Sequence, residues 1–157
     1  MDKVRVGIIG LGNIGVKHAE AISEGQVKGA VLAAICVRNP ERLDWARQVF
    51  GDKIQLFSNV DDFFERADID VVLITTPHYN HPEMAMKAFE KGLHVLCEKP
   101  SGVYTKNVRE MNEAAEKSSK VFSMMFNQRT NPMYQKVREL IQSGELGEIK
   151  RTNWIIT

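Results

Sequence analysis

Val6-Gly-Ile-Ile-Gly-Leu-Gly-Asn-Ile-Gly15 is the stretch of sequence that decides the fold of this chain. An apolar run leads into Gly10, Gly12 and Gly15, and amphipathic residues follow. This order predicts a buried parallel strand, a tight turn and the start of a helix. In such a turn the second glycine lets a pyrophosphate approach the backbone, where the free N–H groups and the helix dipole favour phosphate. The stretch therefore predicts a dinucleotide site, and the alternative is a glycine-rich turn of another α/β protein.

The composition is that of an ordinary soluble globular protein. A length of 157 residues allows one domain with a full core, and a net charge of +1 gives no reason to expect nucleic acid or an anionic membrane as a partner. The first apolar segment is too short for a signal peptide or a membrane span. Cys36 and Cys97 fall in predicted strands, so we expect buried free thiols in a cytoplasmic protein.

Short β-branched runs alternate with helical stretches along the chain. The predicted strands are 3–9, 30–37, 54–57, 70–75, 93–97 and 121–125. The predicted helices are 13–24, 40–50, 60–67, 81–91, 104–118 and 132–143. The alternation predicts an α/β fold of the Rossmann type, a doubly wound parallel sheet covered on both faces. Asn80-x-x-Glu83 is typical of a capping box, and Gly92 suits the end of that helix.

This pattern divides the chain into a complete α/β domain and a shorter segment that follows it. Residues 1–125 are predicted to be an NAD(P)-binding Rossmann domain, and residues 126–157 a connecting helix with a first strand of another domain. The predicted strand, 148–157, has no partner left in the sequence, and a lone strand is not stable. We therefore expect the chain to be the N-terminal part of a longer protein, and the family resemblance given below implies that it is truncated before a second α+β domain.

Three turns are expected to meet along one rim of the sheet. With the strand order 3-2-1-4-5-6, strands 1, 4 and 5 are neighbours, and ligands bind beyond their carboxyl ends. The turns are Gly10–Gly15, Thr75-Thr76-Pro77-His78 and Glu98-Lys99-Pro100. Taken singly, the second would be an ordinary Thr-Pro turn and the third a solvated charged turn. Their convergence favours a binding site.

These residues also carry a family resemblance. The glycine triplet, Thr75-Thr76-Pro77 with Asn80 and His81, and Gly92-Leu-His-Val-Leu-Cys-Glu-Lys-Pro100 resemble the glucose–fructose oxidoreductase and inositol dehydrogenase (Gfo/Idh/MocA) family. Asn127-Gln-Arg-Thr-Asn-Pro132 and Ser143-Gly-Glu-Leu-Gly-Glu148 resemble the passage into that family's second domain. The resemblance implies a homo-oligomeric dehydrogenase that moves a hydride between a nicotinamide and a hydroxyl carbon of a sugar or cyclitol.

The resemblance also implies roles for individual residues. Lys99 would be catalytic, beside nicotinamide and substrate, and Glu98 would hold Lys99 or the cofactor in place. His78 would pack against the cofactor, whereas Gln128 and Arg129 would either contact it or form a hinge. The residues predicted to bind the cofactor are Gly10, Gly12, Asn13, Ile14, Gly15, Arg38, Thr75, Thr76, Pro77, His78, Asn80, His81, Glu98, Lys99, Gln128 and Arg129. The His78-x-x-His81 pair lacks neighbouring ligands, so no metal site is predicted.

The end of the second predicted strand favours NADP over NAD. An NAD site needs an Asp or Glu there for the ribose 2′-OH, but Val37 occupies the position and Arg38 follows. A guanidinium can pair with a 2′-phosphate, and Arg42 lies one helical turn further on. NAD stays the alternative if Arg38 only opens a surface loop.

Two other functions fit the fold. A non-catalytic nucleotide-sensing protein would have no need of Lys99. A methyltransferase would need an acidic residue after the second strand.

Overall fold

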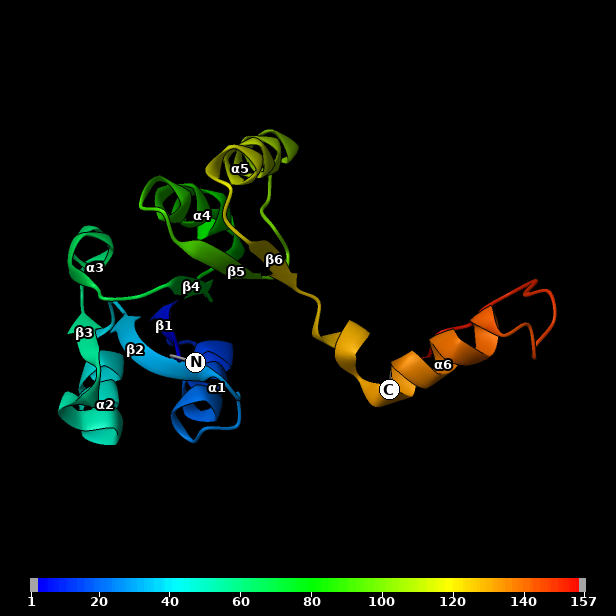
Figure 1. Cartoon of the computed structure of the whole chain (residues 1–157), viewed down its shortest axis with the longest axis horizontal. Coiled ribbons are helices and arrows are strands. Elements are labelled where there is room, and N and C mark those ends of the chain that lie inside the picture. The colour runs from blue at the N-terminus through cyan, green and yellow to red at the C-terminus, as the bar shows by residue number, and fades with distance from the viewer. Residues whose placement is uncertain (1–2, 156–157) are drawn as a thin grey trace. The chain divides into compact units, whose positions relative to one another are not determined.

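The computed structural model describes residues 3–155, which divide into two compact units at Met125 and Phe126. The strands of the first unit are β1 (Val4–Ile9), β2 (Ala30–Cys36), β3 (Gln55–Phe57), β4 (Val71–Ile74), β5 (His94–Glu98) and β6 (Phe122–Met125). Its helices are α1 (Asn13–Ser23), α2 (Pro40–Phe50), α3 (Val60–Arg66), α4 (His81–Glu90) and α5 (Thr105–Ser118), with short 3₁₀ turns at Gly51–Lys53 and His78–Asn80 (Figure 1). Every predicted element of this unit is present, with ends within two residues of the prediction.

The six strands form one parallel sheet in the predicted order. Neighbours follow β3-β2-β1-β4-β5-β6, so the chain leaves the middle of the sheet at β1 and returns to it at β4. Each pair is parallel, for example Ile8 beside Ile35 on one side and beside Leu73 on the other. The reversal of strand order lies between β1 and β4, which is where such sheets bind ligands. The doubly wound Rossmann-type prediction is confirmed.

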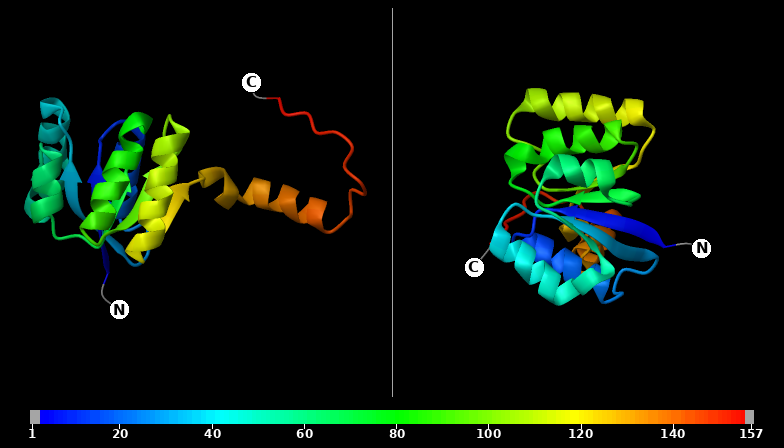
Figure 2. Two further views of the ribbon diagram at one scale, coloured as in Figure 1. Left: turned by 90° about the horizontal axis from the view of Figure 1, so that it is seen from above. Right: turned by 90° about the vertical axis from the view of Figure 1, so that its left-hand side faces the viewer.

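Helices cover both faces of the sheet because its inner strands alternate buried side chains to both sides (Figure 2). On one face Ala19 and Ile22 of α1 pack with Phe50 of α2 against residues such as Ile8 and Leu73. On the other face the buried side chains come from three helices and from the strands between them. Those of the helices are Phe63, Phe64, Met84, Ala85, Ala88, Phe89 and Met111, from α3, α4 and α5. Gly7 makes room for this layer, since a Cβ there would lie 2.7 Å from Phe63 Cζ.

Helix ends follow the sequence signals with one exception. Pro40 begins α2 after Asn39, whose Oδ1 accepts the Arg42 N–H at 3.1 Å, and Gly92 follows α4 with a φ of +71°. The capping box predicted at Asn80 is wrong, because the Asn80 side chain makes no cap hydrogen bond. The 3₁₀ turn that precedes α4 already gives Asn80 a helical backbone, with φ −91° and ψ −14°, whereas a capping residue needs an extended one.

The second unit contains a 3₁₀ turn, Asn127–Thr130, and the helix α6 (Pro132–Gln142). The strand predicted over 148–157 is not formed between 148 and 155, and residues 156 and 157 lie outside the described range. A strand needs a hydrogen-bonded neighbour, and none of the described residues supplies one. Trp154 instead stacks on Tyr134 of α6, with ring centroids 5.2 Å apart.

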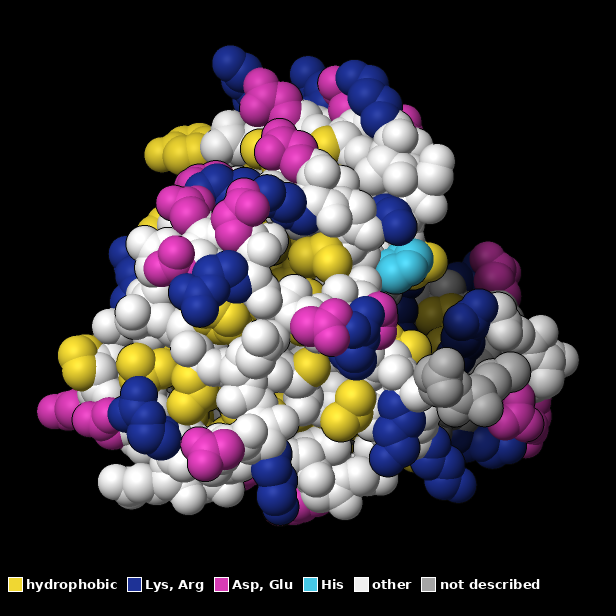
Figure 3. Space-filling model, turned by 60° about the vertical axis from the view of Figure 1, so that its left-hand side comes forward, with side chains coloured by type: hydrophobic (Ala, Val, Ile, Leu, Met, Phe, Trp, Pro, Cys, Tyr) yellow, Lys and Arg dark blue, Asp and Glu magenta, His cyan; other side chains and the backbone are white. Residues whose placement is uncertain are grey.

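The surface carries charges of both signs, in keeping with the small net charge. In Figure 3 basic and acidic side chains neighbour one another over most of the visible face. Within residues 3–155, no helix combines the length and the apolar character needed to cross a bilayer.

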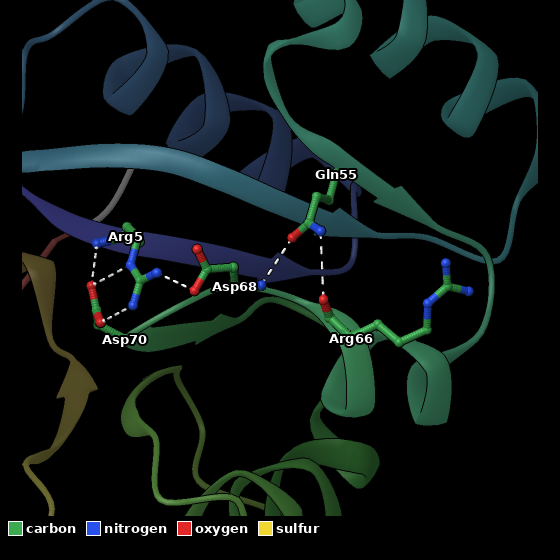
Figure 4. A network of polar contacts seen from close by, with 5 residues as sticks. All are labelled: Arg5, Gln55, Arg66, Asp68 and Asp70. Carbon is green, nitrogen blue, oxygen red and sulfur yellow. Dashed lines mark hydrogen bonds and ion pairs between the residues drawn. The ribbon is translucent and has the colours of Figure 1, made fainter.

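A polar network ties β1 to β4 at the amino ends of these strands, opposite the rim that carries the three turns (Figure 4). The Arg5 guanidinium donates to both carboxylate oxygens of Asp70, at 2.7 and 3.1 Å, and also pairs with Asp68. The Arg5 backbone N–H donates to Asp70 at 2.8 Å. The hydrogen bonds from the Arg5 side chain and backbone lower the pKa of Asp70 to about 2. The network therefore fixes the register of β1 against β4.

The pH dependence of stability tests this network. Because the pKa of Asp70 is lower in the folded chain than its ordinary 3.8, the carboxylate stabilises the fold above about pH 4 and loses this effect as pH falls towards 2. Asp70→Asn should lower the free energy of unfolding at pH 7, modestly because the pair is solvent-exposed, and the difference from wild type should shrink on acidification. Urea unfolding at several pH values measures both. The control is Asp52→Asn, at an exposed site; a pH-independent deficit for Asp70→Asn contradicts the assignment.

Candidate functional site

A groove of about 670 Å³ runs along the carboxyl ends of the central strands. It is lined by residues that follow β1, β2, β3 and β4, all from the first unit. Of the predicted site residues, the groove brings together Gly10, Gly12, Arg38, Thr75, Thr76, Pro77 and Asn80. Lys99, Glu98, His78 and His81 do not line it, although they follow or end strands at the same edge of the sheet. Asn13, Ile14 and Gly15, which follow Gly12 at the start of α1, do not line it either.

The turn after β1 is locked against the turn after β4. The Gly10 N–H donates to the Cys36 carbonyl at 2.8 Å, and the Thr75 hydroxyl donates to the Gly10 carbonyl at 2.7 Å. Gly10 has a φ of +100°, which side chains other than glycine rarely tolerate. A Cβ at Gly15 would lie 2.3 Å from the Gly10 carbonyl oxygen, so helix α1 can start this close to β1 only with glycine at that position.

Gly12 differs from these two glycines because neither its own backbone angles nor any neighbour among the described residues requires glycine there. Its φ of −72° is open to any residue, and an added Cβ would meet no atom within 4 Å. The space over it is part of the groove. Gly12 is also the N-cap of α1, where no side chain caps the helix and no acidic residue occupies the first turn. The first N–H groups of the helix, at Asn13, Ile14 and Gly15, are therefore left for an anion, with the positive end of the helix dipole behind them.

The Thr76 hydroxyl also lacks a partner. Its oxygen is buried and makes no hydrogen bond with any described residue, and Thr76 lines the groove. A buried hydroxyl without a partner is costly unless a ligand satisfies it. Together with the open space over Gly12, this makes the groove a fit for a dinucleotide with a pyrophosphate at the start of α1.

His81 is buried between two turns of the rim. It is 1% exposed, and both ring nitrogens face carbonyl oxygens, Nδ1 that of Pro100 at 2.7 Å and Nε2 that of Thr76 at 2.8 Å. The ring thus joins the turn after β4 to the turn after β5. Binding of a cofactor by His81 stays a prediction.

The turn after β5 presents Lys99 to solvent. The Lys99 side chain is exposed and has no ion-pair partner among the described residues, whereas Glu98 is buried, with 9% of its surface exposed. Glu98 Oε1 accepts a hydrogen bond from His18 Nε2 at 2.9 Å, a contact that the sequence did not predict. His78 is exposed beside Tyr79, with ring centroids 6.1 Å apart.

Gln128 and Arg129 belong to the second unit. The Arg129 guanidinium lies over the Phe126 ring, 5.1 Å from its centroid, and the Arg129 N–H donates to the Phe126 carbonyl at 2.9 Å. Whether these residues contact a cofactor or form a hinge stays a prediction.

The charges in the groove are mixed, with free cations at one side. Arg38 and Arg42, which follow β2, are exposed and have no ion-pair partner among residues 3–155. Lys87 of α4 is paired with Asp61 at 3.0 Å, and this hydrogen bond raises the pKa of Lys87. Val37, at the position of an NAD site's carboxylate, is 8% exposed.

The sequence analysis did not predict that residues following β3 line the groove. Ser58, Asn59 and Asp61 line it beside Arg38. The predicted strand order did contain the signal, since it puts the carboxyl end of β3 next to that of β2.

Both cysteines are buried, and Cys36 lines the groove whereas Cys97 does not. Burial raises the pKa of Cys36 to about 11 and that of Cys97 to about 12, so both stay protonated at neutral pH. Across the described part of the chain, no three His, Cys, Asp or Glu side chains gather closely enough to hold a metal ion.

Known proteins with the same features were found by sequence and by structure. The sequence model described as "Oxidoreductase family, NAD-binding Rossmann fold" (Gfo/Idh/MocA) matches residues 4–126. Glucose-6-phosphate 3-dehydrogenase of Bacillus subtilis is 34% identical over 92% of this chain and 40% of its own length. Myo-inositol 2-dehydrogenase of Thermotoga maritima is 28% identical over 92% of this chain and 42% of its own length.

A solved structure agrees with these relatives. The scyllo-inositol dehydrogenase from Lactobacillus casei, with bound NAD(H) and scyllo-inositol, superimposes with a TM-score of 0.89 and 30% identity, over 94% of this chain and 43% of that one. The chain thus spans about two fifths of the length of the relatives it matches. Since the family model covers most of the chain, the protein belongs to the Gfo/Idh/MocA oxidoreductase family, through the NAD-binding Rossmann fold that its residues 4–126 match.

Proposed function

We propose that this chain is the coenzyme-binding part of an NADP(H)-dependent dehydrogenase that acts on a hydroxyl carbon of a sugar or cyclitol. The observation that carries the proposal is the groove itself. It joins an uncapped α1 N-terminus, the open space over Gly12 and the unpartnered Thr76 hydroxyl at the reversal of strand order. These are the features that a dinucleotide pyrophosphate requires.

Residues at different positions along the rim have different roles in this proposal. The N–H groups of Asn13, Ile14 and Gly15 hold the pyrophosphate, and the Thr76 hydroxyl supplies a further hydrogen bond. When bound, the nicotinamide supplies hydride transfer. The Lys99 side chain lies beside the bound nicotinamide, and its ammonium group donates a hydrogen bond to the oxygen of the reacting carbon. The exposed Lys99 side chain has no ion-pair partner in the described part of the chain, which supports this role.

The preference for NADP rests on the end of β2. The Val37 side chain offers no hydrogen-bond acceptor to a ribose 2′-OH. Arg38 and Arg42 line the groove, and their guanidinium groups have no ion-pair partner among the described residues. Charge-assisted pairs with a phosphate are among the stronger hydrogen bonds in proteins. The scyllo-inositol dehydrogenase structure contains NAD(H). A preference of this chain for NADP would therefore be due to its own residues at the end of β2.

The substrate class follows from the relatives, which are named for inositol and glucose 6-phosphate. We infer that residues 126–157 lead into a second domain that completes the substrate pocket, with Gln128 and Arg129 either in contact with the cofactor or part of a hinge. The full-length enzyme would be a homo-oligomer. Two buried free cysteines agree with a cytoplasmic protein.

Substitutions at two glycines test the site. Gly12→Ala should keep the fold, at a cost of about 1 kcal/mol or less, because the methyl group meets no protein atom. It should weaken NADPH binding about 10-fold or more, since the methyl group occupies the space of the pyrophosphate. Gly15→Ala should instead lower the free energy of unfolding by about 2 kcal/mol or more. Urea unfolding and fluorescence titration measure the two effects; undiminished NADPH affinity in Gly12→Ala would place the pyrophosphate elsewhere.

Arg38→Ala tests the choice of coenzyme. The loss of a guanidinium–phosphate pair should weaken NADPH about 10- to 100-fold and leave NADH nearly unchanged. Arg47→Ala is the control, because Arg47 is on α2, the helix that follows Arg38, and pairs with Asp44 outside the groove. Isothermal titration of both coenzymes against the three proteins gives the comparison. Equal weakening of NADPH and NADH would remove the argument for NADP.

The chain alone should bind coenzyme without turning over substrate. Hydride transfer needs the donor carbon held against the acceptor in a water-poor cleft, and Lys99 is open to solvent. We expect NADPH binding by titration and no coenzyme reduction or oxidation with scyllo-inositol or glucose 6-phosphate. Rapid turnover by residues 1–157 would show that no further domain is required.

A further inference from the structure

The hydrogen bond between His18 and Glu98 joins two elements that the proposed reaction needs in register. His18 is on α1, one turn after Gly15, and Glu98 ends β5 directly before Lys99. The two side chains are 80 residues apart in sequence, and His18 Nε2 lies 2.9 Å from Glu98 Oε1. Both side chains are largely withdrawn from solvent, with 22% and 12% of their surface exposed.

The chemistry of the pair fixes the direction of the hydrogen bond. An ionised carboxylate only accepts hydrogen bonds, so the proton must be on His18 Nε2. A carboxylate as buried as that of Glu98 is costly unless its oxygens find donors. Oε1 has the His18 N–H, and Oε2 has the backbone N–H of Lys99 at 3.3 Å. The carboxylate therefore connects the imidazole on α1 with the backbone of the lysine.

The two ends of this connection differ in function under the proposal above. The start of α1 receives the pyrophosphate, whereas Lys99 acts beside the nicotinamide. A helix is stiff over a single turn, so His18 keeps a fixed position relative to the N–H groups of Asn13–Gly15. Because Glu98 is hydrogen-bonded to both His18 and the Lys99 N–H, the Lys99 backbone is held at a fixed position relative to the start of α1.

We propose that His18 is a positioning residue, which acts through Glu98 to hold the Lys99 turn in register with the coenzyme-binding start of α1. The inference rests on the proposed function of Lys99 and of the α1 N-terminus. The contrasting view is that His18 only fills space between α1 and β5. The two differ in whether the N–H group or merely the bulk of residue 18 matters.

Substitutions that separate these properties test the inference. His18→Leu keeps bulk without a donor, and His18→Gln keeps an N–H that can reach Glu98. Lys17→Leu is the matched control, because Lys17 is the exposed neighbour on α1 with no hydrogen bond from its side chain among the described residues. The readout is the Lys99 backbone amide of the ¹⁵N-labelled chain, by its chemical shift and its hydrogen-exchange rate, with and without NADPH.

In His18→Leu we expect the Lys99 amide resonance to move and its exchange to become about 10-fold faster, because Glu98 is no longer held against it. His18→Gln should restore most of the wild-type shift and rate, and Lys17→Leu should change neither. Glu98→Gln gives a second measure that leaves α1 intact, and it should also speed exchange at Lys99.

Three outcomes count against specific statements. An unchanged Lys99 amide in His18→Leu overturns the inference, and so does identical behaviour of the Leu and Gln variants, which would mean that only bulk matters. Failure of the wild-type chain to bind NADPH would instead overturn the proposed function, and the response of Lys99 to His18 would still decide whether the two turns are linked.

Discussion

The close contact of the β1–α1 turn with the turn after β4 is the constraint on which the rest of this structure depends. The Gly10 carbonyl lies against Gly15 and accepts the Thr75 hydroxyl, while the Gly10 N–H is bound to β2 through Cys36. The ends of three neighbouring strands are thus joined at one residue, Gly10. Only glycine permits this packing, and the packing in turn aims the start of α1 along the rim of the sheet.

The other rim turns are held by side chains rather than by glycine. The His81 ring bridges the carbonyls of Thr76 and Pro100, and His18 reaches Glu98 across the sheet edge. Both histidines are on helices, and both bind groups of the turns that the proposed chemistry uses. In the proposed site, the end that would bind phosphate is made by backbone, and the end that would carry the catalytic lysine is held by two imidazoles.

The fold could be predicted from the sequence because each strand and helix has a recognisable local pattern of apolar residues. Runs such as residues 6–9 of β1 and Val71–Ile74 of β4 are apolar throughout, as buried parallel strands are, and the helices between them carry one apolar side. The two predictions that were wrong, the capping box at Asn80 and the strand over 148–157, both relied on residue type alone. Asn80 and residues 148–155 have the right residue types for a cap and a strand, but the backbone of one and the missing neighbour of the other decide the outcome.

The site was predictable only as far as strand order could carry the argument. Order alone puts Gly12, Arg38 and Thr76 on one rim, and these residues do line one groove. Order does not say which side chains touch, so the His18–Glu98 contact and the burial of His81 could not be read from spacing.

The two cysteines have a practical consequence for spectroscopy of this protein. Maleimide and iodoacetamide dyes react with thiolates, and neither Cys36 nor Cys97 is ionised or accessible at neutral pH. A single cysteine engineered on an outward-facing helix position would accept a fluorophore selectively, with both native thiols left in place. The wild-type background thus already suits single-molecule distance measurements between a labelled helix and a fluorescent ligand.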